Sequence, residues 1–171
     1  EAKSKGYGDA DPELTYTSSG LVGGDQLPGS LTRAPGSAVN TYAITQGTLT
    51  GGSNYTITFA GADLTITAKA IQLTVANKSV TYGETNPENS FELTGGALAS
   101  GDSISSLTYS YSAGPYTVGS HTINGASPVF SSGSAANYQI QIVPGTLTVE
   151  RRSITLSADV KTKTYGSADP E

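Results

Sequence analysis

Closely spaced acidic residues near the start of the chain are the first candidates for chemistry. Asp9, Asp11 and Glu13 lie at alternate positions. Calcium prefers several carboxylate oxygens, so these three residues are candidate calcium ligands. The segment lacks the glycine and the final glutamate that complete an EF-hand loop. The alternative, which we favour, is that Asp11 fixes the turn before Pro12 by accepting hydrogen bonds from nearby backbone amides. We therefore expect no cofactor.

The residue types needed for nucleophilic or transition-metal chemistry are almost absent. The chain has no cysteine, which excludes disulfides and thiolate metal sites. Its single histidine, His121, has no second histidine with which to share a metal ion. We expect His121 to pack on a strand face beside Ile123. The sequence thus predicts no catalytic residue and no enzymatic activity.

Three tyrosines in the second half of the chain form a candidate ligand-binding cluster. Tyr109, Tyr111 and Tyr116 lie close together, and the first two would share one face of a strand. Exposed tyrosines stack on sugar rings or anchor protein contacts, so a glycan or a host protein is the implied ligand. Ordinary cross-strand packing is the alternative, and it is the interpretation that we favour.

The composition indicates strands and turns rather than helices. Charged residues make up 13% of the chain, against about 25% in an average soluble domain, and 21 residues are glycine. Surfaces rich in hydroxyl groups and glycine suit strands and tight turns. The net charge of −5 and the few scattered basic residues argue against a nucleic-acid partner. The absence of a long apolar run predicts no membrane insertion. The absence of methionine predicts that the chain is part of a longer protein.

Internal repetition is the strongest signal in the sequence. A Tyr-Gly motif that ends in Pro-Glu occurs three times, at residues 7–13, 82–88 and 165–171. Other short motifs recur in the same order in successive copies. They are Gly24-Asp25 with Gly101-Asp102, Asn54-Tyr55 with Asn137-Tyr138, Leu64-Thr65 with Leu147-Thr148, and Ile71-Gln72-Leu73 with Ile154-Thr155-Leu156.

These motifs divide the chain into two domains and the start of a third. Repeat 1 covers residues 1–68, repeat 2 covers residues 69–151, and the tail, residues 152–171, is the opening strand of a third repeat. This strand is expected over residues 71–80 in repeat 2 and 153–164 in the tail, whereas repeat 1 lacks most of it. Because few residues separate the repeats, we expect a stiff string rather than domains on a flexible tether.

Repeat 1 has the pattern of short strands separated by Gly, Pro and Ser turns. Strands are expected over residues 13–17, 27–33, 39–45, 55–59 and 64–67, and no window shows a helical period. The predicted fold class is all-β, with two small β-sandwich-like domains arranged end to end. A β-grasp-like sheet in each repeat is the alternative.

The residues of repeat 1 also resemble a known domain family. The resemblance, to the MBG (mostly-beta, glycine-rich) domain of the YGX type, covers nearly all of residues 7–67. Repeat 2 is more divergent, with Asn86 in place of the aspartate and Ser120-His121 in place of Thr41-Tyr42. The motifs that carry the resemblance are Tyr7-Gly8-x-x-Asp11-Pro12, Gly23-Gly24-Asp25, Thr41-Tyr42-x-Ile44, Asn54-Tyr55-x-Ile57-x-Phe59 and Leu64-Thr65-Ile66-Thr67.

This resemblance implies a tandem module of large secreted or cell-surface bacterial proteins, often adhesins or haemagglutinin-like exoproteins, and it implies no catalytic residues. We therefore expect an extracellular stalk or spacer at the bacterial surface that projects a binding tip. The alternative is a glycan- or host-protein-binding module that uses the tyrosine cluster. The tail strand, with apolar Ile154 and Leu156, is predicted to complete repeat 1 of a neighbouring molecule. The expected partners are thus neighbouring repeats and a second copy bound head to tail through residues 153–164.

Overall fold

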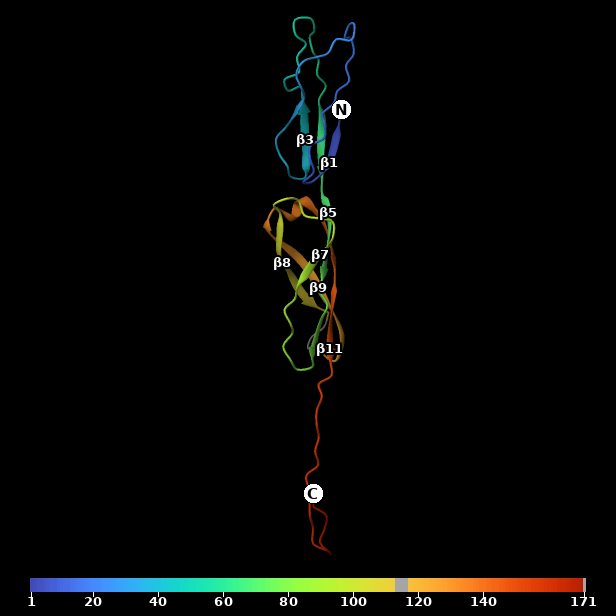
Figure 1. Cartoon of the computed structure of the whole chain (residues 1–171), viewed down its shortest axis with the longest axis vertical. Coiled ribbons are helices and arrows are strands. Elements are labelled where there is room, and N and C mark those ends of the chain that lie inside the picture. Colours follow the sequence, from blue (N-terminus) through green and yellow to red (C-terminus); the bar gives the residue numbers. More distant parts are fainter. Residues whose placement is uncertain (113–116, 171) are drawn as a thin grey trace.

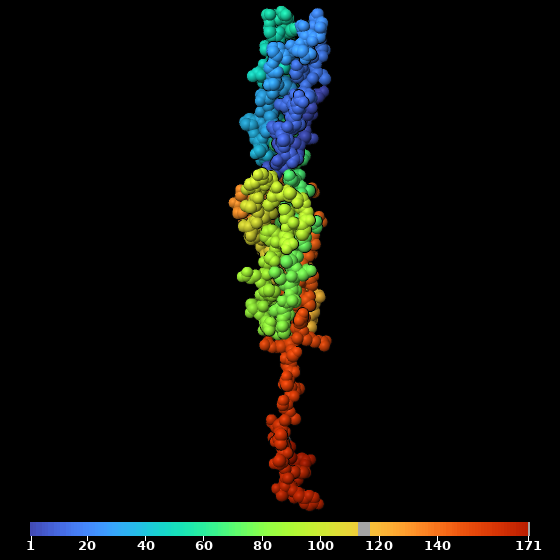
Figure 2. Space-filling model, in the orientation of Figure 1, coloured from blue at the N-terminus to red at the C-terminus, as the bar shows by residue number. Residues whose placement is uncertain are grey.

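The chain is a slender rod of two β domains followed by an extended segment (Figures 1 and 2). The computed structural model describes residues 1–112 and 117–170. Its regular elements are strands, together with one 3-10 turn, η1, at Ala135–Asn137. The predicted all-β class is therefore confirmed. No helix in the described part of the chain is long and apolar enough to cross a membrane.

Repeat 1 is built on one four-stranded sheet in the order β1-β4-β3-β2. Strand β1 (Lys3–Gly6) pairs parallel with β4 (Ala62–Thr67), and β3 (Asn40–Thr45) pairs antiparallel with β4 and with the short β2 (Thr32–Arg33). Side chains alternate between the two faces of a strand. The buried face carries the core of repeat 1, which consists of Tyr42, Ile44, Leu49, Leu64 and Ile66.

Repeat 2 packs two sheets against each other. The three-stranded sheet has the order β10-β5-β7, and the four-stranded sheet has the order β6-β11-β9-β8. Their facing sides form one hydrophobic cluster of Leu73, Val75, Leu107, Ile123, Leu147 and Val149. The strands are β5 (Lys69–Val75), β6 (Lys78–Thr81), β7 (Phe91–Gly95), β8 (Ser103–Tyr111), β9 (Gly119–Ser132), β10 (Tyr138–Val143) and β11 (Gly145–Glu150).

The strand pairings show which positions of the two repeats are equivalent. Lys3 of β1 lies opposite Leu64, as Lys78 of β6 lies opposite Leu147. Leu64 is also the partner of Tyr42, and Leu147 is the partner of His121. The alignment read from the sequence motifs therefore has the same register in space, with β1, β3 and β4 matching β6, β9 and β11.

Two strands expected in repeat 1 do not form. Residues 13–17 and 55–59 have no strand pairing, although Tyr55, Ile57 and Phe59 keep the alternating partial burial of a strand. Their counterparts in repeat 2 are β7 and β10, and both of those strands pair with β5. In repeat 2, β5 lies between these two strands and bonds the backbones of both. Repeat 1 has no strand at that place, so residues 13–17 and 55–59 have no strand with which to pair.

Two other predicted boundaries also need correction. The strand expected over residues 27–33 is reduced to β2, because Pro28 cannot donate a backbone hydrogen bond and Gly29 takes a φ of +99°. The opening strand expected over residues 71–80 is two strands, β5 and β6, separated by Ala76 and Asn77. Strand β5 joins the three-stranded sheet and β6 the four-stranded one, so this break carries the chain from one sheet to the other.

The tail continues out of β11 in an extended conformation, away from repeat 1 (Figure 1). The strand predicted over residues 153–164 is not formed, since no strand in the described part of the chain pairs with it. Ile154 and Leu156 are 78% and 88% exposed. Donation of this segment to a neighbouring molecule stays a prediction.

Candidate functional site: the contact between the two repeats

The Tyr-Gly motif forms the same tight turn in all three copies. In repeat 1 the backbone amide of Asp9 donates to the carbonyl of Gly6 at 3.2 Å. The corresponding bonds in repeat 2 and the tail are both 3.0 Å. The glycine takes a positive φ each time, +80° at Gly8, +86° at Gly83 and +87° at Gly166. A glycine at the third position with positive φ is typical of a type II turn, which explains why glycine follows the tyrosine.

The turn of repeat 1 places Tyr7 against repeat 2. The Tyr7 hydroxyl donates to Oδ2 of Asp102 at 3.0 Å, and the Tyr138 hydroxyl donates to the same oxygen at 2.6 Å. The two tyrosine rings meet edge to face, with centroids 5.4 Å apart and an interplanar angle of 79°. This geometry is favourable for aromatic pairs. One carboxylate therefore holds a phenol from each domain.

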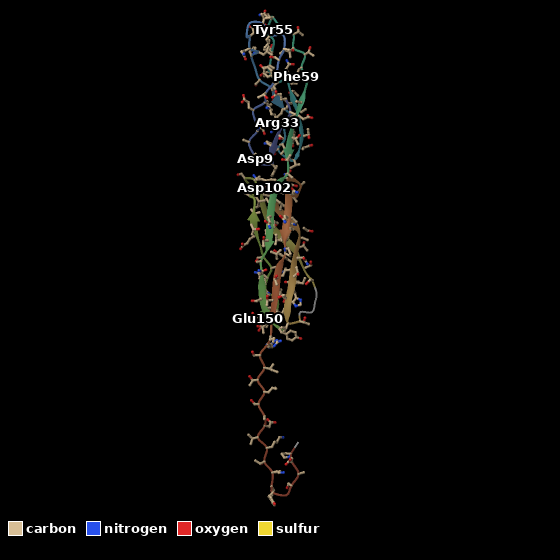
Figure 3. The ribbon with its side chains drawn as sticks, turned by 90° about the vertical axis from the view of Figure 1, so that its right-hand side faces the viewer. Asp9, Arg33, Tyr55, Phe59, Asp102 and Glu150 are labelled. Atoms are coloured by element: carbon tan, nitrogen blue, oxygen red, sulfur yellow. The ribbon has the colours of Figure 1, made fainter. Side chains whose placement is uncertain are left out.

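Backbone atoms of the two repeats also meet closely around this contact. A Cβ atom at Gly8 would lie 2.7 Å from the Cβ of Ala99, so the approach requires glycine. The amide of Val39 donates to Oδ1 of the buried Asn137 at 3.0 Å. Lys69 lies 3.6 Å from Asp9 across the junction. Figure 3 shows Asp9 and Asp102 close together where the domains meet.

Protonation of the two phenols keeps this contact intact at neutral pH. Burial, followed by the hydrogen bond to Asp102, raises the pKa of Tyr138 to about 12. Burial also raises the pKa of Tyr7 above its ordinary value. Both hydroxyls therefore keep their protons and donate to the carboxylate. The Tyr138 ring is further held by stacking on Phe130, with centroids 5.4 Å apart.

The Asp-Tyr pair that receives Tyr7 in repeat 2 has a counterpart in repeat 1. The Tyr55 hydroxyl donates to Oδ2 of Asp25 at 2.7 Å and accepts from the amide of Val22 at 3.1 Å. In repeat 2 the Tyr138 hydroxyl likewise accepts from the amide of Ala99 at 2.9 Å. The tyrosine of the Tyr-Gly turn, Tyr7 in repeat 1, has its counterpart in Tyr82, which is 52% exposed. Each repeat thus has a Tyr-Gly turn and an Asp-Tyr pair.

The connection between the repeats adds a covalent constraint. Strand β4 ends at Thr67 and β5 begins at Lys69, so only Ala68 lies between strands of different domains. In Figure 1 the chain passes from one domain to the other without changing direction. The junction is therefore a strand that continues through, braced at its side by the Tyr7 contact.

The family model of the MBG domain (YGX type) matches this chain twice, over residues 1–65 and 71–148. The chain belongs to the MBG domain family of the YGX type. Searches of curated proteins and of solved structures found no match. The Tyr-Gly turn that the structure places between the MBG domains contains the two residues in the family's name.

The three candidate calcium ligands, Asp9, Asp11 and Glu13, have different surroundings in the first MBG domain. Asp11 bonds Lys5 and Arg33, each at 2.7 Å, while Asp9 faces Lys69. Glu13 is exposed. No group of three or more metal-binding side chains was found among the described residues. Cations of the chain itself lie against Asp9 and Asp11.

The tyrosine cluster of the second MBG domain lies partly against its core. Tyr109 and Tyr111 are half-buried and pack on the hydrophobic cluster, and burial raises the pKa of Tyr109. Tyr111 also exchanges hydrogen bonds with Asn89 at 2.9 and 3.1 Å. Tyr116 lies outside the described residues. These contacts favour packing over an exposed ligand platform, and ligand binding stays a prediction.

His121 lies on β9 of the second MBG domain, on the same strand face as Ile123. Its Nε2 is 2.7 Å from the carbonyl oxygen of Thr117.

The residues of the interdomain contact were visible in the sequence as recurring motifs. Their pairing was not, because nothing in the motifs shows that Tyr7 contacts the Asp-Tyr pair of the following repeat.

Replacing Asp11 by Asn is expected to lower the stability of the first MBG domain in a pH-dependent way. The hydrogen bonds from Arg33 and Lys5 lower the Asp11 pKa to about 2. Ionised Asp11 therefore stabilises the fold above its ordinary pKa of 3.8, and this contribution is lost as the pH falls to about 2. The side chain is 42% exposed, so the effect should be about 1 kcal/mol or less.

The difference in free energy of unfolding between wild type and D11N should be measured by urea titration over this pH range. It should be present at neutral pH and vanish near pH 2. A difference that stays constant with pH would show that the ion pairs contribute nothing.

Replacing Tyr7 by Phe is expected to destabilise the first MBG domain while preserving its ring contact. The variant removes a hydrogen bond to a charged acceptor, a loss of about 1.5–3 kcal/mol in typical cases. Urea unfolding followed by tyrosine fluorescence would measure the change. Tyr165→Phe is the matched control, because Tyr165 occupies the same turn in the tail and is fully exposed. Equal effects of the two variants would rule out a specific role for the Tyr7 hydroxyl.

Proposed function

We propose that this chain is a segment of a stiff extracellular stalk in a bacterial cell-surface adhesin, which projects a binding tip away from the cell. The observation that carries the proposal is the contact of Tyr7 with Asp102 and Tyr138, which fixes one MBG domain on the next. In this proposal the domains act as spacers and catalyse no reaction. The membership of the MBG family supports a repeat module of surface proteins.

The geometry of the junction supports stiffness in two ways. A single residue between β4 and β5 leaves little length for a hinge. The side contact then opposes bending about that residue, because bending would break the hydrogen bond from Tyr7 to the Asp102 carboxylate and separate two packed rings. If every pair of neighbouring domains made this same linker and this same side contact, the rod would extend over any number of repeats.

The experiment that tests this proposal measures the distance between the far ends of the two domains. Because the chain has no cysteine, Asn54→Cys and Glu150→Cys would place dyes only at the chosen ends. Single-molecule fluorescence energy transfer should then give one narrow population. Freely jointed domains would instead give a broad distribution whose mean shifts to shorter distances, and that result would refute a stiff spacer.

A further inference from the structure

The two tyrosines at the junction are placed so that they can react with each other. Their rings meet edge to face, with centroids 5.4 Å apart. Both hydroxyls donate to the same oxygen of Asp102, at 3.0 and 2.6 Å, so the hydroxyl-bearing edges of the two rings converge. The ring carbons ortho to a phenol hydroxyl belong to that edge. The contact therefore brings the ortho carbons of Tyr7 towards those of Tyr138.

The same contact supplies a base for the oxidation of either phenol. A phenol that loses one electron becomes a strong acid, and it passes its proton to the nearest acceptor. The Asp102 carboxylate already accepts a hydrogen bond from each hydroxyl, so it is that acceptor for both rings. A base in this position lowers the energy needed to remove the electron. The tyrosyl radical that results carries much of its unpaired spin on the ortho carbons.

We propose that Tyr7 and Tyr138 are a site of oxidative coupling, at which a one-electron oxidant joins the two MBG domains through a dityrosine bond. Each phenol gives one electron to the oxidant and one proton to Asp102, which passes the proton on to water. A carbon–carbon bond then forms between two ortho carbons, and the hydrogen on each of these carbons moves to the oxygen of its own ring. The pair loses two electrons and two protons in total, and two equivalents of the oxidant are reduced.

The surroundings of the pair favour coupling between these two rings over coupling to another molecule. Tyr138 is 7% exposed, and its ring is held by stacking on Phe130. Tyr7 is partly buried against it. A radical formed on either ring therefore meets the other ring first. The bond would link the domains at their side, in addition to the backbone between β4 and β5. The proposal rests on this contact and does not require the stalk role.

Oxidation of the dilute chain by a photogenerated ruthenium(III) tris-bipyridyl complex tests the proposal. Dilution suppresses coupling between molecules, and the monomer is isolated under denaturing conditions before it is analysed. The wild-type monomer should show the blue fluorescence of dityrosine. Its tryptic digest should contain residues 6–33 joined to residues 79–151, at the combined mass of the two peptides less two hydrogen atoms. Oxidation in concentrated urea should lose this joined peptide, because unfolding separates the rings.

Substitutions by phenylalanine locate the bond within the joined peptide. Tyr7→Phe and Tyr138→Phe should each abolish it, because phenylalanine has no hydroxyl proton to lose. Tyr16→Phe and Tyr82→Phe are the matched controls, since each changes an exposed tyrosine on one of the same two peptides. Both controls should retain the joined peptide at the wild-type yield.

A substitution of the carboxylate tests its role as the base. Asp102→Asn should slow the formation of the joined peptide, because an amide accepts a hydrogen bond but does not take up the proton. Asp25→Asn is the matched control, since Asp25 accepts the corresponding hydrogen bond from Tyr55 in repeat 1. Coupling at the same rate in both variants would show that Asp102 does not accept the protons.

A wild-type monomer that yields dityrosine but no joined peptide, or no dityrosine at all, would overturn the proposal. A joined peptide that persists in Tyr7→Phe or Tyr138→Phe would also overturn it. The distance distribution between dyes is measured on the unoxidised chain, so the stiffness of the rod is tested independently of this result.

Discussion

Replacing Gly8 by Val is expected to convert the junction between the MBG domains into a hinge. A valine there must adopt a φ of +80° and place its Cβ about 2.7 Å from the Cβ of Ala99. The backbone conformation alone costs a side chain about 1–2 kcal/mol, and the clash forces the domains apart. Tyr7 then moves away from Asp102 and loses its hydrogen bond to the carboxylate, whereas Tyr138 keeps its own. The dye pair at Asn54 and Glu150 should report a broadened distance distribution.

Gly83→Val is the control that separates strain from contact. Gly83 has a φ of +86° in the equivalent turn, and its Cβ would meet only an Arg152 guanidinium nitrogen at 3.1 Å. A valine at Gly83 therefore has the same unfavourable backbone conformation, but it does not clash with a neighbouring domain. The control should therefore lose stability but keep the narrow distance distribution. If both variants stay rigid, the single-residue linker alone sets the stiffness, and the tyrosine contact is dispensable.

Replacing Leu73 by Ala should cause the largest loss of stability of any change described for this chain. Leu73 is fully buried between the two sheets of repeat 2, and truncation of such a leucine costs roughly 2–5 kcal/mol. Because β5 pairs with both β10 and β7, a cavity beneath it weakens both pairings. Urea titration followed by circular dichroism should show a lower midpoint for repeat 2.

Leu156→Ala provides the matched control for this cavity. Leu156 occupies the same motif position as Leu73 but is 88% exposed. In dilute solution this variant should unfold like wild type. A comparable loss of stability in both variants would mean that the tail packs on the domains of its own chain.

The sequence predicted the repeats and the strands that have partners within their own repeat. Strands β3 and β4 were found because Tyr42 with Ile44 and Leu64 with Ile66 alternate clearly. Residues 13–17 and 55–59 show the same alternation, yet they form no strand. A strand needs a neighbour for its backbone bonds, and alternation alone does not report whether that neighbour is present.

The candidate site was harder to predict for a related reason. Tyr7 and Asp102 lie in different repeats, and each belongs to a short recurring motif. Whether the two residues make contact depends on how the two domains are placed relative to each other. The Asn-Tyr and Gly-Asp motifs were recognised as recurring, and the structure shows that they meet within each repeat. The contact across the junction depends on the direction in which β4 leads into β5, which is a property of the assembled sheets.

The path of the chain through repeat 2 also determines how the domain responds to tension. The chain enters along β5 beside the junction and leaves along β11 at the opposite end, with β5 parallel to β10 and β11 parallel to β6 (Figure 1). A pull on the two ends is therefore directed along these strands and loads their hydrogen bonds in shear, many at once. An anchored rod of such domains would resist hydrodynamic drag through all of these bonds together, without the sequential unzipping of a hairpin.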